Sequence, residues 1–393
     1  MALSNSDGTS TPLGYQPSLD GLRGVAVLAV MTYHSGLIRG GFLGVDMFFA
    51  LSGFLITRLL LQERAATGAT SLRGFYVRRA LRLLPALIVF LLLWTCFLLI
   101  TVPPEYWGIV GRYVAAVLFY VANWAGIHGL PMGIFGHTWS LAIEEQFYLV
   151  WPFAVAVLAG RLRRPRLIAC LLALAAAVSL AWRLHLALGG ATERRIYWAT
   201  DAHADGLLIG AALAFLLVGG RRLTRAGPVA SGMALVAVVG LLGLLVAVPF
   251  NPSYAYGVSA LAALATSALI LEVGRPGSRV ARLLEVRWLV WAGRISYGLY
   301  LWHFPIFSQF GVLKLPGHLP SPLPGLLAWS VTFAAALASY FFVERPALVY
   351  KDRFSWRERE AGVEPLDVVA PGALARITGQ TFGEHVVVTE TRI

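Results

Sequence analysis

Residues 83–102 read LLPALIVFLLLWTCFLLITV and contain no charged side chain. A helix needs roughly 20 mainly apolar residues to cross the hydrocarbon core of a bilayer, so this run predicts a transmembrane helix. Comparable runs recur up to about residue 346, and 58% of all residues are hydrophobic while only 13% are charged. Soluble domains carry about 25% charged residues, so the composition indicates a protein that is embedded in lipid.

The apolar runs together predict an all-α, polytopic membrane helix bundle of about ten transmembrane helices. We expect spans near residues 19–38, 42–62, 83–102, 138–160, 167–188, 203–219, 228–248, 254–273, 289–312 and 323–345. One transmembrane domain, residues 19–346, would lie between an N-terminal segment, residues 1–18, and a short polar tail, residues 347–393. Residues 107–126 are apolar as well. An eleventh span there would turn every later Arg-rich loop outward, so we expect an interfacial or re-entrant helix.

The basic residues set the expected orientation. The chain has 32 Lys and Arg residues against 20 Asp and Glu residues, which gives a net charge of +12. Most of the basic residues lie in short clusters between apolar runs. This is the positive-inside pattern of membrane proteins, and it argues against a nucleic-acid-binding domain, which would need its own soluble fold. With both termini in the cytoplasm, the outer loops hold only Arg39, Arg112, Arg194, Arg195 and Lys314. The Arg-rich, Lys-poor usage favours a bacterial cell membrane.

The first predicted span contains Asp20, Arg23 and His34. Ionisable groups within membrane helices are costly and usually functional. Arg23 and His34 are close to three helical turns apart, so both leave nearly one face and lie roughly 16 Å apart along the axis. Arg23 would lie near the cytoplasmic surface and His34 in the outer half of the bilayer. The other interpretation of His34 is a hydrogen-bonded core histidine.

A carboxylate follows in the second span. His34 and Asp46 are each six residues from Gly40, so a tight hairpin there would set them at equal depth. A carboxylate beside an imidazole fixes its tautomer and raises its basicity, as general-base catalysis requires. We therefore predict His34 and Asp46 as catalytic residues. The alternative is a buried pair that only locks the hairpin.

An arginine cluster precedes the third span in FYVRRALRLLPA, residues 75–86. Arg78 and Arg82 are one helical turn apart, and Arg79 and Arg82 are also neighbours on a helix. Three guanidinium groups at the cytoplasmic surface suit the phosphates of a cofactor. Ordinary positive-inside charge is the other explanation, and Arg23, which projects toward the same surface, favours the phosphate site.

The fourth span carries a polar stripe on one helical face, formed by His137, Ser140, Glu144, Tyr148 and Trp151. Such a stripe avoids lipid and should face the interior of the bundle. Glu144 and Glu145 cannot share one face, so we expect them to have different partners. Both are predicted as proton-handling or acceptor-binding groups of the site, and a structural polar link is the alternative for either one.

Two further clusters could bind a sugar hydroxyl or a neighbouring helix. In the sixth span Asp201 and Asp205 are one turn apart with His203 between them, and in the ninth Ser296, Tyr300 and His303 share a face that Tyr297 flanks. As acceptor contacts we predict His137, Ser140, Tyr297 and His303.

Six segments together resemble the acyltransferase-3 family of membrane O-acyltransferases. In chain order they read LDGLRGVAVLAVMTYHSG, GGFLGVDMFFALSGFLIT, FYVRRALRLLPA, HTWSLAIEEQFYLVWP, SYGLYLWHFPIF and FVERP, and they extend over residues 19–346. The family's pattern of Arg, ten residues and His matches Arg23 and His34. Its Arg-x-x-Arg element matches Arg79 and Arg82. His203 stands where family members often have Arg, so the role of that position is left open.

The resemblance implies transfer of an acyl group from acyl-CoA, such as acetyl-CoA or a short-chain acyl-CoA, to a hydroxyl of a sugar-containing acceptor. It makes His34 the catalytic residue, which either deprotonates the acceptor or carries the acyl group covalently. It assigns Arg23, Arg79 and Arg82 to the donor. Cys96, Cys170 and the histidines lack the spacing of metal ligands, so no metal is expected.

The acceptor has two candidates among compact family members, which include macrolide antibiotic O-acyltransferases and glycan O-acetylases. Short length and composition slightly favour a macrolide, as in antibiotic biosynthesis. The alternative is O-acetylation of a cell-surface or exported polysaccharide. A membrane transporter is the alternative of another class, since His, Asp and Arg inside a bundle also mark substrate pathways. Transporters often show internal repeats or paired broken helices, which the sequence does not display.

Overall fold

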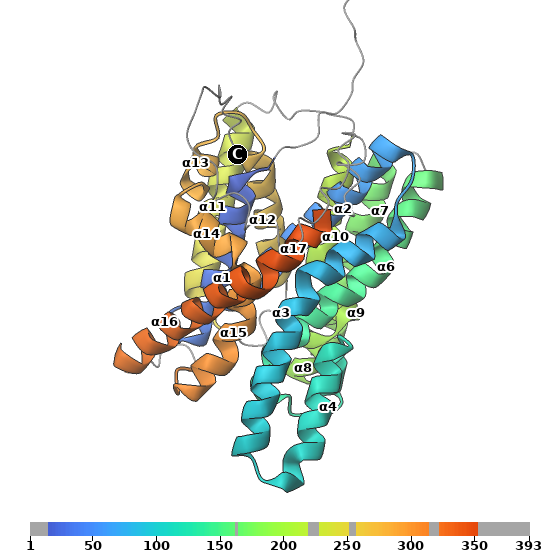
Figure 1. Cartoon of the computed structure of the whole chain (residues 1–393). Helices are drawn as coiled ribbons and strands as arrows, with labels where there is room; N and C mark the ends of the chain where they lie inside the picture. Colours follow the sequence, from blue (N-terminus) through green and yellow to red (C-terminus); the bar gives the residue numbers. More distant parts are fainter. Residues whose placement is uncertain (1–14, 162–163, 219–227, 251–256, 314–321, 353–393) are drawn as a thin grey trace, which may run out of the picture. The chain divides into compact units, whose positions relative to one another are not determined.

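The computed structural model describes residues 15–161, 164–218, 228–250, 257–313 and 322–352, and these ranges contain helices but no strand (Figure 1). The all-α prediction is therefore confirmed for the part of the chain that is described. The helices are α1 (Pro17–His34), α2 (Gly44–Thr67), α3 (Leu72–Thr101), α4 (Trp107–Leu118), α5 (Ala122–Ile127), α6 (Trp139–Arg161), α7 (Pro165–Leu188), α8 (Glu193–Trp198), α9 (Thr200–His203), α10 (Asp205–Leu216), α11 (Pro228–Ala247), α12 (Val258–Val273), α13 (Arg279–Leu284), α14 (Arg287–Arg294), α15 (Ser296–Gln309), α16 (Pro322–Ser339) and α17 (Arg345–Asp352).

Within the described ranges, three short 3-10 helices and one π-helix connect these elements. The 3-10 helices are Gly41–Leu43, Pro104–Tyr106 and Gly133–Thr138, and the π-helix, Tyr340–Glu344, joins α16 to α17. Local chemistry sets several helix ends. The Ser71 hydroxyl accepts a hydrogen bond from the Gly74 amide and caps the start of α3. Gly68 adopts a positive φ of 75° directly after α2, a conformation that glycine takes without steric cost.

Among the described residues, five helical stretches are long and apolar enough to cross a membrane. They are Gly41–Thr67, Leu72–Thr101, Gly133–Arg161, Pro165–Leu188 and Pro322–Tyr350, and they match the second, third, fourth, fifth and tenth predicted spans. Asp205–Leu216 and Val258–Val273 are apolar but shorter. The count of about ten spans and the cytoplasmic location of both termini therefore stay predictions.

The ninth predicted span, residues 289–312, is wrong as a continuous helix because the chain leaves helical geometry at Ile295, between α14 and α15. Close packing accompanies this break. A Cβ on Gly293 would lie 1.7 Å from the Asp20 carbonyl oxygen, so only glycine lets α14 approach α1 this closely.

Residues 107–126 form no single helix either. They divide between α4 and α5, and Tyr120 in the connection has a φ of 53°. Neither piece reaches the roughly 20 residues that a span needs, which agrees with the expected interfacial or re-entrant segment.

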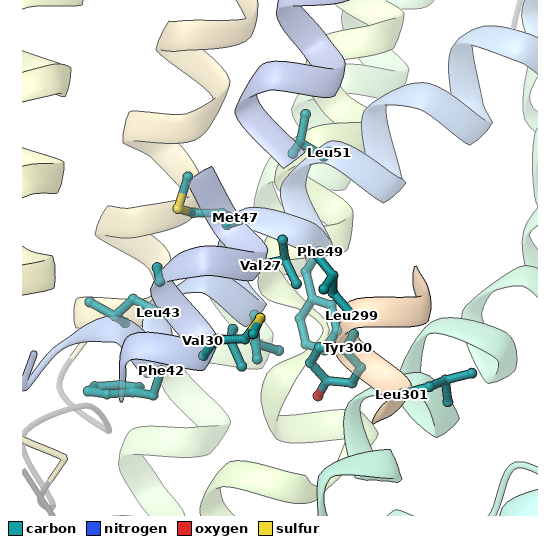
Figure 2. Close-up of a cluster of buried hydrophobic side chains, with 14 of the residues drawn as sticks. Val27, Val30, Phe42, Leu43, Met47, Phe49, Leu51, Leu299, Tyr300 and Leu301 are labelled. Atoms are coloured by element: carbon teal, nitrogen blue, oxygen red, sulfur yellow. The ribbon is translucent and has the colours of Figure 1, made fainter. Parts of the chain in front are cut away.

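The core lies where α1, α2 and α15 meet (Figure 2). Buried side chains from these helices and the turn before α2 interlock there, with ten of them labelled in the figure: Val27, Val30, Phe42, Leu43, Met47, Phe49, Leu51, Leu299, Tyr300 and Leu301. α2 also packs against α10, where Gly53 meets the Leu207 carbonyl and Gly210 meets the Ala50 carbonyl. The core therefore fixes α1 and α15, the two helices that carry His34 and His303.

The outward faces of the long helices are apolar. Large exposed hydrophobic side chains include Leu92, Leu93 and Ile100 of α3, Leu149 and Val150 of α6, Leu174 and Val178 of α7, Leu326 of α16, and Phe342. Contiguous apolar surface of this kind is rare on soluble monomers and suits contact with lipid. The chain is accordingly a membrane protein.

Candidate active site

The site is organised along α1, which starts at Pro17 and is unbroken to its last residue, His34. Arg23 and His34 therefore leave one face of one helix, roughly 16 Å apart along its axis, as the sequence predicted. Arg23 is partly buried, and its Nη2 donates a hydrogen bond to the Ser296 hydroxyl, 3.2 Å away at the start of α15. His34 is also only partly buried, so its ring can meet a substrate.

His34 joins a cluster of aromatic rings at the end of α1. Its Nδ1 lies 3.2 Å from Nε2 of His303, and the edge of its ring meets the ring of Phe304 with centroids 5.1 Å apart. His303 in turn contacts the ring of His137, which stacks on Phe304. His303 and His137 are buried. The sequence thus named the three histidines that the fold brings together, but it did not predict that His303 pairs with His34.

Three predicted acceptor contacts, His137, Ser140 and Tyr297, are hydrogen-bonded to other residues of the protein. The hydroxyls of Ser140 and Tyr300 form a hydrogen bond, and Tyr300 also donates to the His137 carbonyl, 2.9 Å away. His137 Nε2 lies 3.1 Å from the Leu301 carbonyl, while the Tyr297 hydroxyl donates to the Leu83 carbonyl of α3 at 3.1 Å. These hydrogen bonds link α15, which carries His303, to α3, α6 and the 3-10 helix Gly133–Thr138.

Arg79 lies between the two glutamates of α6. Its Nε and Nη2 both donate to Glu145 Oε1, at 3.1 and 2.9 Å, and its guanidinium stacks over the Tyr148 ring at 3.8 Å. Glu144 lies 3.8 Å from the same guanidinium and accepts a hydrogen bond from the Ser52 hydroxyl at 3.0 Å. The prediction of different partners for the two glutamates is therefore wrong in part, since they share Arg79.

The other arginines of the cluster differ in how they are compensated. Arg78 pairs with the buried Glu63 at 3.2 Å, so its charge is engaged within the protein. In the described part of the chain no carboxylate lies within ion-pair distance of the Arg82 guanidinium. The like charges of Arg23 and Arg79 repel it, and the carboxylates of Asp20 and Glu344 attract it without forming an ion pair with it. Arg23 and Arg82 thus leave positive charge for an anion, whereas Arg78 and Arg79 do not.

The chemistry available is that of a partly exposed imidazole at one end of α1 and an anion site at the other. The family model for an acyltransferase domain, acyltransferase-3, matches residues 16–344 of this chain. The chain belongs to the acyltransferase-3 family.

Relatives of this acyltransferase-3 chain are bacterial. The peptidoglycan O-acetyltransferase OatA of Listeria monocytogenes is 32% identical over 380 residues, which cover 88% of this chain and 60% of the relative. The O-acetyltransferase OatA of Staphylococcus aureus is 33% identical over 346 residues, covering 84% and 57%. The chain thus spans less than two thirds of the length of these relatives. No solved structure matches it.

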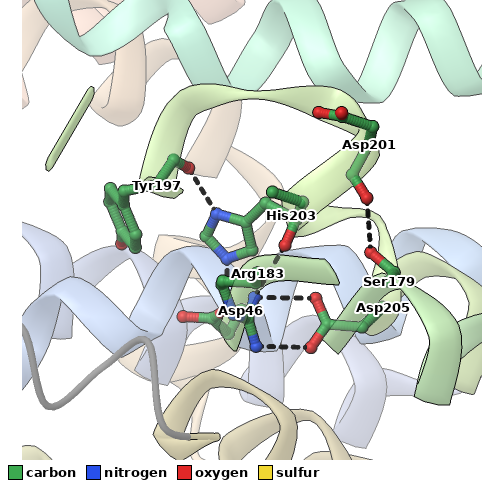
Figure 3. A network of polar contacts seen from close by, with 8 residues as sticks. Asp46, Ser179, Arg183, Tyr197, Asp201, His203 and Asp205 are labelled. Atoms are coloured by element: carbon green, nitrogen blue, oxygen red, sulfur yellow. Dashed lines mark hydrogen bonds and ion pairs between the residues drawn. The ribbon is translucent and has the colours of Figure 1, made fainter. Parts of the chain in front are cut away.

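In this acyltransferase-3 chain Asp46 does not orient His34, and that prediction is wrong. Asp46 Oδ1 lies 2.8 Å from Nε2 of His203, whose Nδ1 lies 2.6 Å from the Tyr197 carbonyl (Figure 3). Beside them Arg183 forms two hydrogen bonds with Asp205, at 3.0 and 2.9 Å. All four charged or titratable side chains are buried. Asp46 and His203, whose role the sequence left open, thus belong to a polar network between α2, α7 and the start of α10.

Three contacts were not predicted from the sequence. Arg183 and Asp205 lie in consecutive predicted spans, and two opposite charges in lipid are expected to neutralise one another, which is a signal that could have found their pairing. The Ser52 bond to Glu144 and the Ser296 bond to Arg23 carry no charge signal, so no pattern in the sequence could have found them.

Proposed function

We propose that this chain transfers an acetyl group from acetyl-CoA to a hydroxyl of a cell-surface glycan such as peptidoglycan, with His34 as the general base. The observation that carries the proposal is the shared face of α1, with Arg23 near its start and His34 at its end. The glycan acceptor rests on the relatives, which are named as O-acetyltransferases, one of them of peptidoglycan.

The donor would bind with its phosphates on Arg23 and Arg82, neither of which forms an ion pair with a carboxylate among the described residues. Guanidinium groups bind phosphates through charge-assisted hydrogen bonds. The Arg23 bond to the neutral Ser296 hydroxyl leaves its charge available. The pantetheine arm would then extend along α1 and bring the thioester to His34.

The acceptor hydroxyl would meet His34 on its exposed side, where the imidazole takes the hydroxyl proton as the oxygen attacks the thioester carbonyl carbon. The carbon–sulfur bond then breaks, and the CoA sulfur leaves with the proton that His34 returns. The macrolide acceptor that length and composition slightly favoured stays a prediction that no relative supports.

The test is acetyl transfer by the purified full chain in detergent, with acetyl-CoA and soluble peptidoglycan fragments as substrates. We expect acceptor-dependent release of CoA and an alkali-labile acetyl ester on the fragment, detected by mass spectrometry. His34→Ala should abolish transfer, while His185→Ala, which alters an exposed histidine that stacks on Trp182, should not.

Three outcomes would overturn parts of the proposal. Acetylation of a macrolide but not of the glycan fragment would contradict the proposed glycan acceptor. Full activity of His34→Ala would contradict the role of His34 as general base. Solute flux without acetyl transfer would favour the transporter.

A further inference from the structure

His303 lies directly behind His34, and its hydrogen bonds determine where its own proton sits. Nδ1 of His303 is 2.7 Å from the Tyr300 carbonyl oxygen and 3.2 Å from the Leu299 carbonyl oxygen. A carbonyl oxygen can only accept, so Nδ1 must carry the hydrogen. His303 is fully buried, and in the described part of the chain no carboxylate pairs with it. Its ring neighbours are His34, His137, Tyr300, Phe304 and Phe307.

A second proton on His303 would create a buried cation without a counter-ion, which is costly. His303 is therefore neutral, and its Nε2 is an acceptor with no hydrogen. Among the described residues, Nδ1 of His34 is the one hydrogen-bonding group found against this nitrogen, 3.2 Å away. Nδ1 of His34 must then be the donor of this hydrogen bond.

We infer that His303 is a positioning residue, which holds His34 in the tautomer with its proton on Nδ1 and so makes Nε2 the reacting nitrogen. A neutral imidazole has one N–H, so a proton fixed on Nδ1 leaves the lone pair on Nε2. His34 is partly exposed while His303 is fully buried, so only His34 can touch a substrate. This inference rests on the proposed function and names the atom through which His34 acts.

The transfer step follows from this assignment. The lone pair of His34 Nε2 takes the proton of the acceptor hydroxyl while the hydroxyl oxygen bonds to the thioester carbonyl carbon. The resulting imidazolium keeps its Nδ1–H bonded to His303 Nε2, which stabilises the charge. When the carbon–sulfur bond breaks, the proton on Nε2 moves to the departing sulfur, and His34 returns to its starting tautomer.

The edge of the His34 ring against Phe304 supports the same assignment, since it limits rotation of the imidazole. A ring turned by 180° would present Nε2 to His303 and Nδ1 to the substrate. In this structure Nδ1, and not Nε2, faces His303.

The test compares His303→Gln with His303→Leu in the purified full chain. The glutamine carbonyl can accept the His34 Nδ1–H, whereas leucine cannot. We expect His303→Leu to lower kcat on the order of 100-fold with little change in the KM for acetyl-CoA, and His303→Gln to remain within about tenfold of the unaltered chain. Equal activity of the leucine variant and the unaltered chain, or equal loss in both variants, would overturn the inference.

A second readout does not depend on activity and is made on the unaltered chain, with a folded His34→Gln variant used only to assign the signals. With ¹⁵N-labelled histidine in the unaltered chain, the His34 ring signals are those absent from His34→Gln, and they report which nitrogen carries the hydrogen. We expect a protonated Nδ1 and an unprotonated Nε2. The reverse would contradict the inference even if acetyl transfer is found. If no transfer is found but the expected tautomer is, the proposed function fails and the pairing stands.

Discussion

Asp46 and His203 form a buried pair, with Oδ1 of Asp46 2.8 Å from Nε2 of His203. His203 is held at its other nitrogen by the Tyr197 carbonyl, so both ring nitrogens are engaged. His203 and Asp46 are both buried, and within the described residues no hydrogen bond or ion pair joins Asp46 to His34. This pair therefore stabilises the fold, and its loss should be visible as instability.

Replacing Asp46 by Ala should lower the free energy of unfolding by about 3–5 kcal/mol, because it strips a buried partner from His203. Thermal unfolding of the purified chain in detergent measures this effect. Asp46→Asn, which keeps a hydrogen-bond acceptor, should lower the free energy of unfolding by less than Asp46→Ala. An Asp46→Ala variant that unfolds like the unaltered chain but has lost its kcat would restore Asp46 as a catalytic residue.

Asp205→Ala should lower the free energy of unfolding at least as much as Asp46→Ala does. It leaves the Arg183 guanidinium buried without the carboxylate that binds it at 2.9 Å. We expect poor recovery of folded protein from the membrane, measured by gel filtration in detergent. The double change Arg183→Leu with Asp205→Leu removes both charges and should recover part of the loss. If the double variant yields no more folded protein than Asp205→Ala, the unpaired charge of Arg183 is not the cause of the loss.

Arg82→Ala should raise the KM for acetyl-CoA about tenfold or more with a smaller change in kcat. A hydrogen bond to a charged group contributes about 1.5–3 kcal/mol, and each 1.4 kcal/mol corresponds to a factor of ten in binding. Arg73, exposed near the start of the same helix, supplies the matched control as Arg73→Ala. Equal effects of the two changes would show that general positive charge, and not a specific anion site, binds the donor.

The division of residues 107–126 into α4 and α5 predicts that this segment does not cross the membrane. Cysteines placed at Glu105 and Gly129, after Cys96 and Cys170 are changed to Ala, should react with an impermeant thiol reagent from the same side. Intact cells and broken cells distinguish the two faces. Reaction of the two positions from opposite faces would add a span and reverse the orientation of the helices that follow.

The fold was predictable wherever length and apolar content decide it. Five long apolar stretches fall on predicted spans because a bilayer demands about 20 apolar residues in a row. The break at Ile295 was not predictable in this way, since residues on both sides of it remain mostly apolar. It depends on how closely α14 packs on α1 at Gly293, which is a contact between distant parts of the sequence.

The site was predictable in which residues it contains more than in how they pair. Spacing along α1 correctly placed Arg23 and His34 on one face, because helical periodicity fixes both depth and direction. For Asp46, the fact that it and His34 are each six residues from Gly40 predicted only its depth in the bilayer. The partner that its direction around the axis of α2 selects is His203, the last residue of α9, which leads into α10, the helix that packs against α2.

Two contacts join the same pair of helices in the same order, Arg23 to Ser296 and His34 to His303, and α15 is one helix from Ser296 to Gln309. α1 and α15 therefore run in the same direction, and the single helix α15 contacts both Arg23, the residue proposed to bind the donor phosphates, and His34, the residue proposed as the general base. A ligand that draws Arg23 away from Ser296 breaks the contact at the start of α15, while the contact between His303 and His34 is kept. Substitutions that shift α15 as a body cannot alter donor affinity and turnover separately.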